Sequence, residues 1–536
     1  MYLGIDFGTC FSAVALSIGS TIMDGTGEDT VGIPTLFLYD SDSNVNRVGK
    51  DCKGNMYAIK NSDSVVRYIK TLVRTEPEKL DDPSAIYSGG KYFSQRDVVK
   101  NILTFLIEKG KEFSKGVVKD STLEGVCITA PAAVGTSLML STEYRAMLID
   151  VICEITGLNE SRITVLPEPV AAAIHYLHES DVENQSVLVF DLGGGTLDVT
   201  VITYSCENKI PRYSIERIDG DAELGGNAYD EALSRYVLTN VYDLDPDTVQ
   251  FSDPMEKYTF DEAVTKLKID LSSMPWGMGT FSVNGDMRPA RITESEFDDI
   301  TKDLTSRAMT VTQRMVNSCD GGIRSINKIV LVGGGSNMPL IRRAIETTFP
   351  EFPKENILVH EPSKAISKGA ALFTTFKSGG VAPYVFDPVV ENSYGWGAMN
   401  SGVIPAKEMI YNILMKETKF ATGESKVSVD TDSAFHAIEN NQTKVVFVVY
   451  ESNVRVDDCI DGHWVDFGAG QKTCGIEVTI PVPTEYIGRA CEYNLFPRLV
   501  LDKNGILRLE VYDTDGNLLG AEQNAIHGSN RRLMRS

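Results

Sequence analysis

The chain has 536 residues, 42% hydrophobic and 23% charged, an ordinary globular composition with room for roughly three to four domain-sized units. Its net charge of −23 argues against nucleic acid or an anionic membrane surface as the main partner, and solubility is the simpler interpretation of that charge. The nine cysteines are scattered without a C-x-x-C pair, which excludes a local metal or disulfide framework and favours free thiols in a reducing compartment. With no signal peptide and no apolar run of roughly 20 residues, we expect a cytoplasmic protein.

Two segments far apart in the sequence share one pattern. The stretches 2–17, "YLGIDFGTCFSAVALS", and 187–204, "VLVFDLGGGTLDVTVITY", each pass from an apolar strand through aspartate and glycine into a second strand. Each pattern predicts a β-hairpin whose turn is made of glycine and threonine. Because the second copy begins 185 positions after the first, the chain suggests a duplicated α/β unit rather than a short solenoid repeat.

The rest of the chain divides into a helix-rich part and a strand-rich part. Segments 96–113 and 260–273 have helical patterns, and 328–349 predicts a strand, a glycine turn and a helix. Short alternating segments follow at 443–452, 474–483 and 505–513, which predict antiparallel strands. We therefore expect an α/β domain over 1–378, a linker over 379–388, a β domain over 389–525 and a polar tail over 526–536.

Three predicted turns contain the small residues that suit a phosphate site. They are Gly8–Thr9, Gly193–Thr196 and Gly333–Ser336. Glycine lets backbone N–H groups converge on an anion, and nearby carboxylates can hold a divalent cation, usually Mg²⁺ through its water shell. Asp6, Asp191 and Asp198 are placed for that role. One such hairpin is more often only a turn, but three with three acids predict a nucleoside triphosphate site, although no Walker A loop is present.

Several motifs in this order resemble the nucleotide-binding domain of the heat shock protein 70 family, the DnaK-like molecular chaperones. They are "GIDFGTCFSAVA", "ITAPAAVG", "LPEPVAAAIHY", "VFDLGGGTLDVTV", "DAELGGNAYDEAL" and "IVLVGGGSNMP". Later segments, "AFHAIENNQTKVVFVVYES", "IEVTIPVP" and "LVLDKNGILRLEVYD", resemble the substrate-binding domain of the same family. The resemblance implies an α/β actin-like ATPase domain of duplicated, ribonuclease H-like halves, followed by an antiparallel β-sandwich.

The resemblance also implies roles for individual residues, with ATP, ADP and Mg²⁺ as ligands. Asp6, Asp191 and Asp198 would hold the metal and order the attacking water. Lys70 would polarise the γ-phosphate, the simpler alternative being an exposed helix lysine, and Glu168 would position water or Mg²⁺. Thr196 would also be one of the catalytic residues. The implied nucleotide-binding residues are Gly8, Thr9, Cys10, Phe11, Gly193, Gly194, Gly195, Gly225, Gly226, Asp230, Lys268, Gly333, Gly334, Gly335, Ser336 and Asn337.

Some positions depart from the family pattern. Cys10 replaces a threonine in the first turn, and Thr265, Asn337 and Ser363 stand where the adenosine pocket usually carries glutamate, arginine and aspartate. Loss of an arginine stacked on adenine removes a cation–π contact of roughly 0.5–2 kcal/mol. We therefore expect weaker nucleotide binding, with the choice between ATP and GTP left open.

A peptide groove and a linker are implied in the C-terminal part. The groove residues would be Met399, Phe435, Ile438 and Val445, and the apolar linker would be Tyr384, Val385, Phe386 and Asp387. Trp396 and Ile438 replace smaller residues, so the pocket would be narrower than usual. The alternative is that these residues are sandwich core. Because fewer than 25 residues follow "EVYD", we expect no helical lid.

The favoured interpretation is an ATP-dependent, chaperone-like protein that binds extended unfolded polypeptide, as a monomer and with a J-domain co-chaperone as a candidate partner. A second hypothesis is a nucleotide-switched module dedicated to one protein partner. A third, a metabolite kinase on the actin fold, is disfavoured by the C-terminal domain.

The stretch 513–524 begins like a calcium loop but lacks the turn glycine and the final glutamate, so it predicts a hairpin turn.

Overall fold

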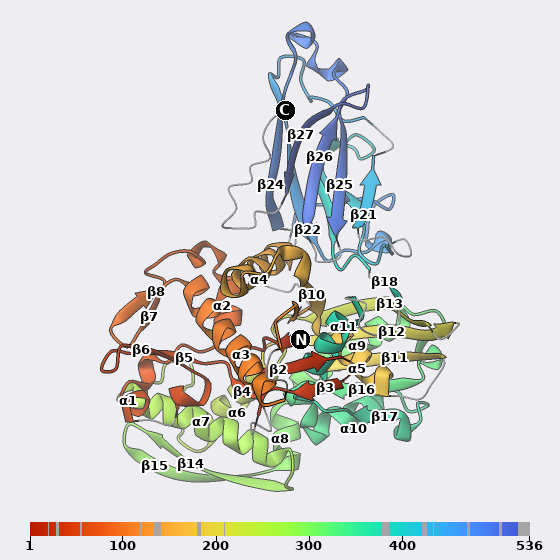
Figure 1. Ribbon diagram of the computed structural model, residues 1–536. Helices are drawn as coiled ribbons and strands as arrows, with labels where there is room; N and C mark the ends of the chain where they lie inside the picture. Colours follow the sequence, from red (N-terminus) through yellow and green to blue (C-terminus); the bar gives the residue numbers. More distant parts are fainter. Residues whose placement is uncertain are drawn as a thin grey trace.

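A computed structural model of the chain shows a large α/β part and a smaller β part (Figure 1). The residues that it describes are 1–19, 21–27, 32–53, 56–117, 121–132, 141–179, 184–207, 210–377, 385–387, 389–420, 426–431, 434–468, 472–502 and 506–523. The predicted linker residue Tyr384, the turn at 504–505 and the polar tail lie outside these ranges. Among the described helices, none combines the length and apolar character needed to cross a membrane.

The first predicted hairpin opens a mixed sheet with the strand order β10-β9-β1-β2-β3. Its strands are β1 (Tyr2–Asp6), β2 (Phe11–Ile18), β3 (Thr21–Asp24), β9 (Gly125–Ala130) and β10 (Ile163–Pro167), with β4 (Ile33–Pro34) beside β2. Strand β1 pairs antiparallel with β2 and parallel with β9. Because both faces of the central strands are covered, their residues form continuous apolar runs rather than an alternation.

The second predicted hairpin lies in a second sheet with the order β17-β16-β11-β12-β13-β18. Its strands are β11 (Asn184–Leu192), β12 (Leu197–Glu207), β13 (Ile210–Asp221), β16 (Lys328–Val332), β17 (Ile357–Val359) and β18 (Val385–Asp387). Strand β11 pairs antiparallel with β12 and parallel with β16, as β1 does with β2 and β9. Both hairpins expected from the repeated sequence pattern are therefore confirmed.

Two helices join the sheets. Helix α5 (Glu168–Glu179) runs from β10 to β11, and α11 (Ala365–Lys377) returns from β17 and packs on β1. Helices α5 and α11 pass so close that a Cβ on Gly369 would lie 1.7 Å from the carbonyl oxygen of Ala171. Helix α11 also lies so close to β1 that a Cβ on Gly4 would lie 2.2 Å from the backbone of Ala371. Glycine is required at these crossings because the backbones themselves touch.

The remaining elements of the α/β part surround these sheets. Helices α3 (Gln95–Val117) and α4 (Ser141–Thr156) cover the first sheet, and α9 (Lys302–Asn317) and α10 (Pro339–Thr348) cover the second (Figure 1). Two outer groups lie beyond the sheets: α1 (Met56–Lys60), α2 (Ile69–Thr75), β5 (Phe37–Asp40), β6 (Val45–Val48), β7 (Ile86–Ser88) and β8 (Lys91–Phe93); and α6 (Gly226–Asn240), α7 (Pro254–Leu271), α8 (Glu294–Ile300), β14 (Trp276–Val283) and β15 (Asp286–Thr293). The helices predicted over 96–113 and 260–273 are confirmed as α3 and α7.

The C-terminal part consists of two antiparallel sheets, as predicted. One has the order β23-β20-β19-β22-β24 and the other β21-β25-β26-β27. Their strands are β19 (Ser393–Asn400), β20 (Lys407–Leu414), β21 (Lys426–Asp430), β22 (Lys444–Ser452), β23 (Trp464–Val465), β24 (Lys472–Pro481), β25 (Phe496–Asp502), β26 (Leu507–Tyr512) and β27 (Leu518–Gln523). Side chains of both sheets share one apolar core that contains Trp396, Phe447 and Leu509.

Candidate functional site

The three predicted turns follow β1, β11 and β16 and come together between the two sheets; we call the site that they form the cleft. In the first turn, Asp6 ends β1 and Thr129 Oγ1 donates to its Oδ1 at 3.5 Å. A Cβ on Gly8 would lie 2.0 Å from the carbonyl oxygen of Phe11, so only glycine fits there. Thr9 is buried, Cys10 is partly buried and the Phe11 side chain is 37% exposed.

The second and third turns pack directly on each other. The N–H of Gly193 donates to the carbonyl of Thr196 at 3.0 Å, which closes the second turn. In the third turn Gly333 has φ +77°, and a Cβ on it would lie 2.4 Å from Oδ1 of Asp191. Gly334, Gly335, Ser336 and Asn337 form the short helix η6 after it. The buried Ser336 hydroxyl donates to the carbonyl of Val332 at 2.5 Å.

A fourth segment, the predicted "LGGNAYD" loop, closes against the other turns. The N–H of Gly226 donates to the carbonyl of Gly193 at 2.9 Å, and a Cβ on Gly225 would lie 2.5 Å from the backbone of Gly195. A Cβ on Gly194 would lie 2.6 Å from Sγ of Cys10. The glycines predicted to bind nucleotide thus share one tightly packed site, where side chains would separate the turns.

Three buried carboxylates, the partly exposed Asp6 and one buried ammonium group lie beside these turns. Lys70 is 2% exposed, and its Nζ donates to Oε1 of Glu168 at 2.5 Å. Lys70 is therefore not the exposed helix lysine of the simpler interpretation. Asp191 and Asp198 are paired across β11 and β12, and Asp198 accepts hydrogen bonds from the N–H of Ala132 and from Thr196 Oγ1.

The burial of several acids together disfavours their charged forms. Burial and, after it, the charge of Glu168 raise the pKa of Asp6 to about 7, although Lys70 and the hydrogen bond from Thr129 oppose the shift. Burial, followed by the charges of Glu168, Asp198 and Asp6, raises the pKa of Asp191 well above its usual value. Burial lowers the pKa of Lys70, but Glu168, Tyr144 and Asp6 outweigh it and hold that pKa above its usual value.

These residues fit a bound divalent cation. Oδ2 of Asp191 is buried without a hydrogen-bond partner among the described residues, which is costly unless a ligand satisfies it. Lys70 is the one ammonium group that directly bonds the cluster Asp6, Glu168, Asp191 and Asp198 in the described part of the chain. Carboxylate oxygens with excess negative charge are the donors that Mg²⁺ prefers, and a bound cation would restore the ionised forms.

A second polar group lies under the "LGGNAYD" loop. Lys268 Nζ donates to Oδ2 of Asp230 at 2.7 Å and to the carbonyl of Gly226 at 2.9 Å. Burial raises the pKa of Asp230, and Lys268 opposes that shift. Sγ of Cys10 lies 3.0 Å from Oδ1 of Asn227, and burial raises the pKa of Cys10 to about 11. Cys10 is therefore a neutral thiol, unsuited to nucleophilic chemistry at neutral pH.

The three residues that replace the family's usual adenosine-pocket residues differ in how deeply they are buried. Thr265 lies near Asp230 and acts to lower its pKa, so it belongs to the polar group under the loop. Asn337 is exposed, with Nδ2 donating to the carbonyl of Gly334 at 3.2 Å, and Ser363 is partly buried. Lys53 pairs with Glu262 of α7 at 2.8 Å and so links the two outer groups of elements.

The predicted linker is placed in part by the structure. Strand β18 extends the second sheet by pairing parallel with β13, with Val385, Phe386 and Asp387 opposite residues 212–214. Oδ2 of the buried Asp387 accepts from Arg212 Nε at 2.6 Å and from Ser214 Oγ at 2.8 Å. The linker backbone is thus bound to the α/β part.

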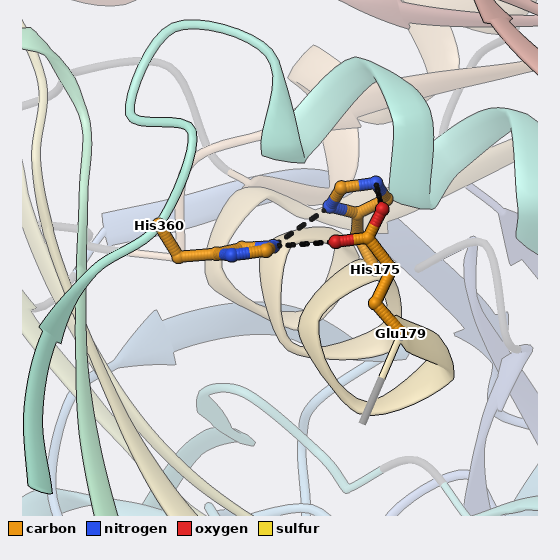
Figure 2. A group of neighbouring side chains, drawn as sticks. All are labelled: His175, Glu179 and His360. Carbon is orange, nitrogen blue, oxygen red and sulfur yellow. Dashed lines mark hydrogen bonds and ion pairs between the residues drawn. The ribbon is translucent and has the colours of Figure 1, made fainter. Parts of the chain in front are cut away.

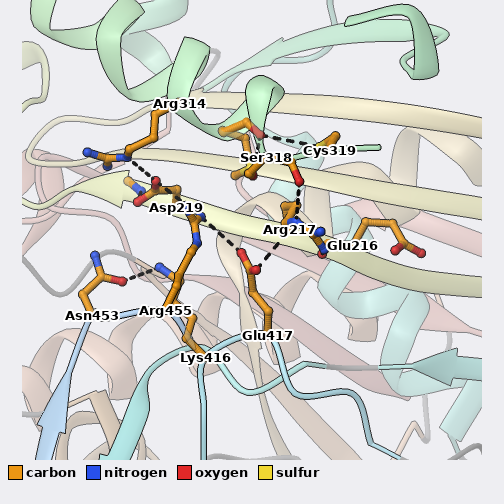
Figure 3. Close-up of polar contacts among 12 residues, drawn as sticks. Glu216, Arg217, Asp219, Arg314, Ser318, Cys319, Lys416, Glu417, Asn453 and Arg455 are labelled. Atoms are coloured by element: carbon orange, nitrogen blue, oxygen red, sulfur yellow. Dashed lines mark hydrogen bonds and ion pairs between the residues drawn. The ribbon is translucent and has the colours of Figure 1, made fainter. Parts of the chain in front are cut away.

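Charged residues that the sequence did not single out join the β part to the α/β part (Figure 3). Glu417 lies 3.6 Å from Arg217 and 3.2 Å from Arg455, while Asp219 accepts from Arg314 at 2.9 Å. We call this group, with Lys416, the interdomain cluster; its members follow β20 and β22 or lie on β13 and α9. No local spacing marks these residues, because the partners are far apart in the sequence.

The predicted groove residues do not share one environment. Phe435 packs edge-on against the fully buried Trp396, with ring centroids 5.2 Å apart. Val445 is partly buried against the same core, whereas Met399 and Ile438 are 40% and 64% exposed. Two of the four residues therefore contribute to the core, as the alternative interpretation expected, and two remain available at the surface.

Comparisons with known proteins agree with this architecture. A family model described as Hsp70 protein matches residues 2–458. The chain is 26% identical over 477 residues to the chaperone protein DnaK of Psychrobacter cryohalolentis, covering 85% of this chain and 68% of the relative. It is also 26% identical to DnaK of Stenotrophomonas maltophilia (84% and 69% covered) and to DnaK of Buchnera aphidicola (90% and 75% covered). Because the family model matches most of the chain, this protein belongs to the Hsp70 family.

Proposed function

We propose that residues 1–378 hydrolyse ATP to ADP and phosphate with Mg²⁺. The observation that carries this proposal is the cluster of the partly exposed Asp6 with the buried Glu168, Asp191, Asp198 and Lys70, beside converging glycine turns. Membership of a family of ATPases supports it. Mg²⁺ held by Asp6, Asp191 and Asp198, through water, would neutralise part of the phosphate charge.

The residues of the chain act chiefly by positioning and by charge. The backbone N–H groups of the glycine turns and the Thr9 and Thr196 hydroxyls hold the phosphates. Lys70 Nζ donates to a γ-phosphate oxygen, and Glu168 and Asp198 orient the attacking water. The water oxygen bonds to the γ-phosphorus as the bond to the β–γ bridging oxygen breaks, which yields ADP and phosphate. Such a site needs little covalent chemistry from the protein.

The matching strand orders of the two sheets support a division of residues 1–378 into duplicated, ribonuclease H-like halves of an actin-like domain. In this proposal residues 379–388 are the linker and residues 389–525 the substrate-binding domain. The β-sandwich binds extended polypeptide through main-chain hydrogen bonds and one or two buried side chains. Met399 and Ile438 supply exposed apolar surface for that contact, and a J-domain protein is a candidate partner.

A second function is favoured by the packing around Trp396. Because Trp396 and Phe435 fill the space beneath the predicted groove, the β domain has less room for diverse side chains. The alternative is a nucleotide-switched module that recognises one protein partner. A peptide array separates the two: binding of many apolar peptides supports the general chaperone, and binding of none supports the dedicated module.

The ATPase proposal is tested with single substitutions in the full chain. Asp198→Ala and Lys70→Ala should each lower ATP turnover at least tenfold, about 1.4 kcal/mol or more of transition-state stabilisation. Lys266→Ala removes an exposed lysine of α7, 73% exposed, and should leave turnover unchanged. Circular dichroism establishes that each variant is folded. Unchanged turnover in both folded site variants would refute the assignment.

A further inference from the structure

Two histidines and a glutamate meet at the far end of α5, away from the cleft (Figure 2). His175 and Glu179 lie one turn apart on the helix, and His360 follows directly after β17. Glu168 opens the same helix, and along its axis His175 and Glu179 lie about 10 Å and about 16 Å from it. The cluster is therefore a separate feature of the molecule.

The ligand atoms of the three side chains converge. His175 Nδ1 lies 2.9 Å from His360 Nε2, His175 Nε2 lies 3.3 Å from Oε1 of Glu179, and His360 Nε2 lies 3.7 Å from Oε2 of Glu179. One atom from each residue can be chosen so that all lie within 4.8 Å of one another. Ligands at 2.0–2.1 Å from a tetrahedral metal lie about 3.3 Å apart, so small rotations would complete such a set.

The surroundings keep both imidazoles in the form that binds metal. Burial, together with His360, lowers the pKa of His175 to about 3, and burial also lowers the pKa of His360. Neutral rings can present a lone pair to a cation. Glu361 lies 3.9 Å from His175 Nε2 but accepts from Lys368 Nζ at 2.5 and 2.7 Å, so it is already engaged.

We propose that His175, Glu179 and His360 bind a divalent transition-metal ion, best matched by Zn²⁺, with a fourth coordination position open to water. Two imidazoles and one carboxylate suit zinc, cobalt or nickel rather than Mg²⁺, which prefers oxygen donors. His175 and Glu179 come from the helix that leaves the first sheet, and His360 from the edge of the second sheet. The bound ion would therefore join the C-terminal end of α5 to the segment that follows β17 of the second sheet.

The test uses the full chain, stripped of metal with a chelator and titrated with Zn²⁺ by calorimetry. We expect saturation at one equivalent per chain in excess Mg²⁺. Glu179→Gln and His360→Gln should each weaken Zn²⁺ binding at least tenfold. Glu179 is exposed, so its variant tests the site even if a histidine variant misfolds. His178→Gln alters an exposed histidine of the same helix and should leave Zn²⁺ binding unchanged.

The nine free cysteines are the competing ligands, and Co²⁺ distinguishes them. Co²⁺ at the proposed site should give weak visible bands without a thiolate-to-cobalt charge-transfer band. Zn²⁺ should raise the unfolding temperature of the native chain and of His178→Gln, and not that of Glu179→Gln. Absence of Zn²⁺ binding, equal affinity in folded Glu179→Gln and His360→Gln, or a thiolate band with Co²⁺ would each overturn the proposal.

Discussion

The cleft and the interdomain cluster both bury charged side chains, but they differ in balance. In the cleft, four carboxylates surround Lys70, and Oδ2 of Asp191 has no partner among the described residues. In the interdomain cluster, Oε1 of Glu417 and two guanidinium nitrogens of Arg455 also lack a hydrogen-bond partner among the described residues, but the carboxylates of Asp219 and Glu417 each lie within ion-pair distance of at least one arginine. A buried excess of one sign is tolerated where a ligand supplies the opposite charge, whereas balanced charges can hold two surfaces together.

The pKa shifts of the two regions differ in the same way. Those of Asp6 and Asp191 in the cleft are raised, because burial and neighbouring acids outweigh Lys70. Burial also acts to raise the pKa of Asp219, but Lys416 and Arg314 outweigh it and hold that pKa below its usual value. The region with an uncompensated negative charge, and not the one with more ion pairs, is therefore the better candidate for ligand chemistry.

The largest expected effect comes from removing one charge in each region. Asp191→Asn should lower ATP hydrolysis at least a hundredfold, within the roughly 10²–10³-fold range for losing one preorganised electrostatic group. Asp219→Asn, the matched control, should leave hydrolysis within about threefold. Steady-state kinetics of both variants at saturating Mg²⁺ and ATP check this. Similar losses in both variants would remove the distinction between ligand site and docking contact.

The interdomain cluster predicts the next effect. Glu417→Gln removes the carboxylate that faces Arg217 and leaves Arg455 only the longer contact to Asp219, at 3.7 Å. Because Glu417 and both arginines are partly exposed, we expect about 1–3 kcal/mol of lost docking energy. That loss shifts the equilibrium between docked and undocked domains about fivefold or more toward the undocked state. Small-angle scattering and proteolysis of the 379–388 linker measure the separation. Asp466→Asn breaks an exposed pair with Lys407 and should not change either measurement.

The opposite pKa shifts predict opposite pH slopes. For Asp6, the folded state binds more protons than the unfolded state between pH 4 and 7, so its contribution to stability falls as pH rises through that window. The full shift corresponds to about 4 kcal/mol, but because Asp6 is partly exposed we expect about 1–2 kcal/mol. Urea unfolding without nucleotide or Mg²⁺ should show Asp6→Asn flattening this slope.

The lowered pKa of Asp219 has the reverse sign. Its folded state binds fewer protons than the unfolded state, so its contribution is complete above pH 4 and is lost only as pH falls below its usual value of 3.8. Asp219→Asn should therefore leave the slope between pH 4 and 7 unchanged. A flattened slope in Asp219→Asn, or an unchanged slope in Asp6→Asn, would contradict the assignment of the pH effect to the cleft.

The sequence predicted the features that local pattern controls. Both glycine hairpins, α3, α7 and the antiparallel C-terminal strands were confirmed, because alternation, helical period and turn chemistry lie within short windows. The placement of Lys70 against Glu168, 98 positions away, was reachable only through the family resemblance. The site roles, the groove and the domain boundaries remain predictions.

Pairings over long sequence distances could not be predicted from the residues alone. Nothing near His175 points to His360, and nothing near Arg217 points to Glu417, because the sheet topology brings them together. Trp396 shows a related limit. The alternating sequence around Trp396 fits either a groove or a core. The rings of Phe435 and Phe447 pack on Trp396, and this packing shows that it belongs to the core.

The smallest expected effect is a gain in ATP affinity when a positively charged side chain is added at the edge of the cleft. Asn337 is exposed and stands where the family usually has an arginine, so a long side chain fits there without displacing the core. If stacking on adenine is the missing interaction, Asn337→Arg should tighten ATP binding by about 0.5–1 kcal/mol, as expected for an exposed cation–π contact. Calorimetric titration of ATP with Mg²⁺ measures this change.

Asn337→Lys separates stacking from charge. Lysine adds the same positive charge without the planar guanidinium group that stacks on a base. If Arg tightens binding more than Lys, and the difference persists in high salt, stacking accounts for the gain. If both variants gain the same ATP affinity and lose it in high salt, the gain comes from the added positive charge and not from stacking. No gain with either residue would mean that position 337 does not reach the base, and the predicted adenosine pocket would be wrong at this residue.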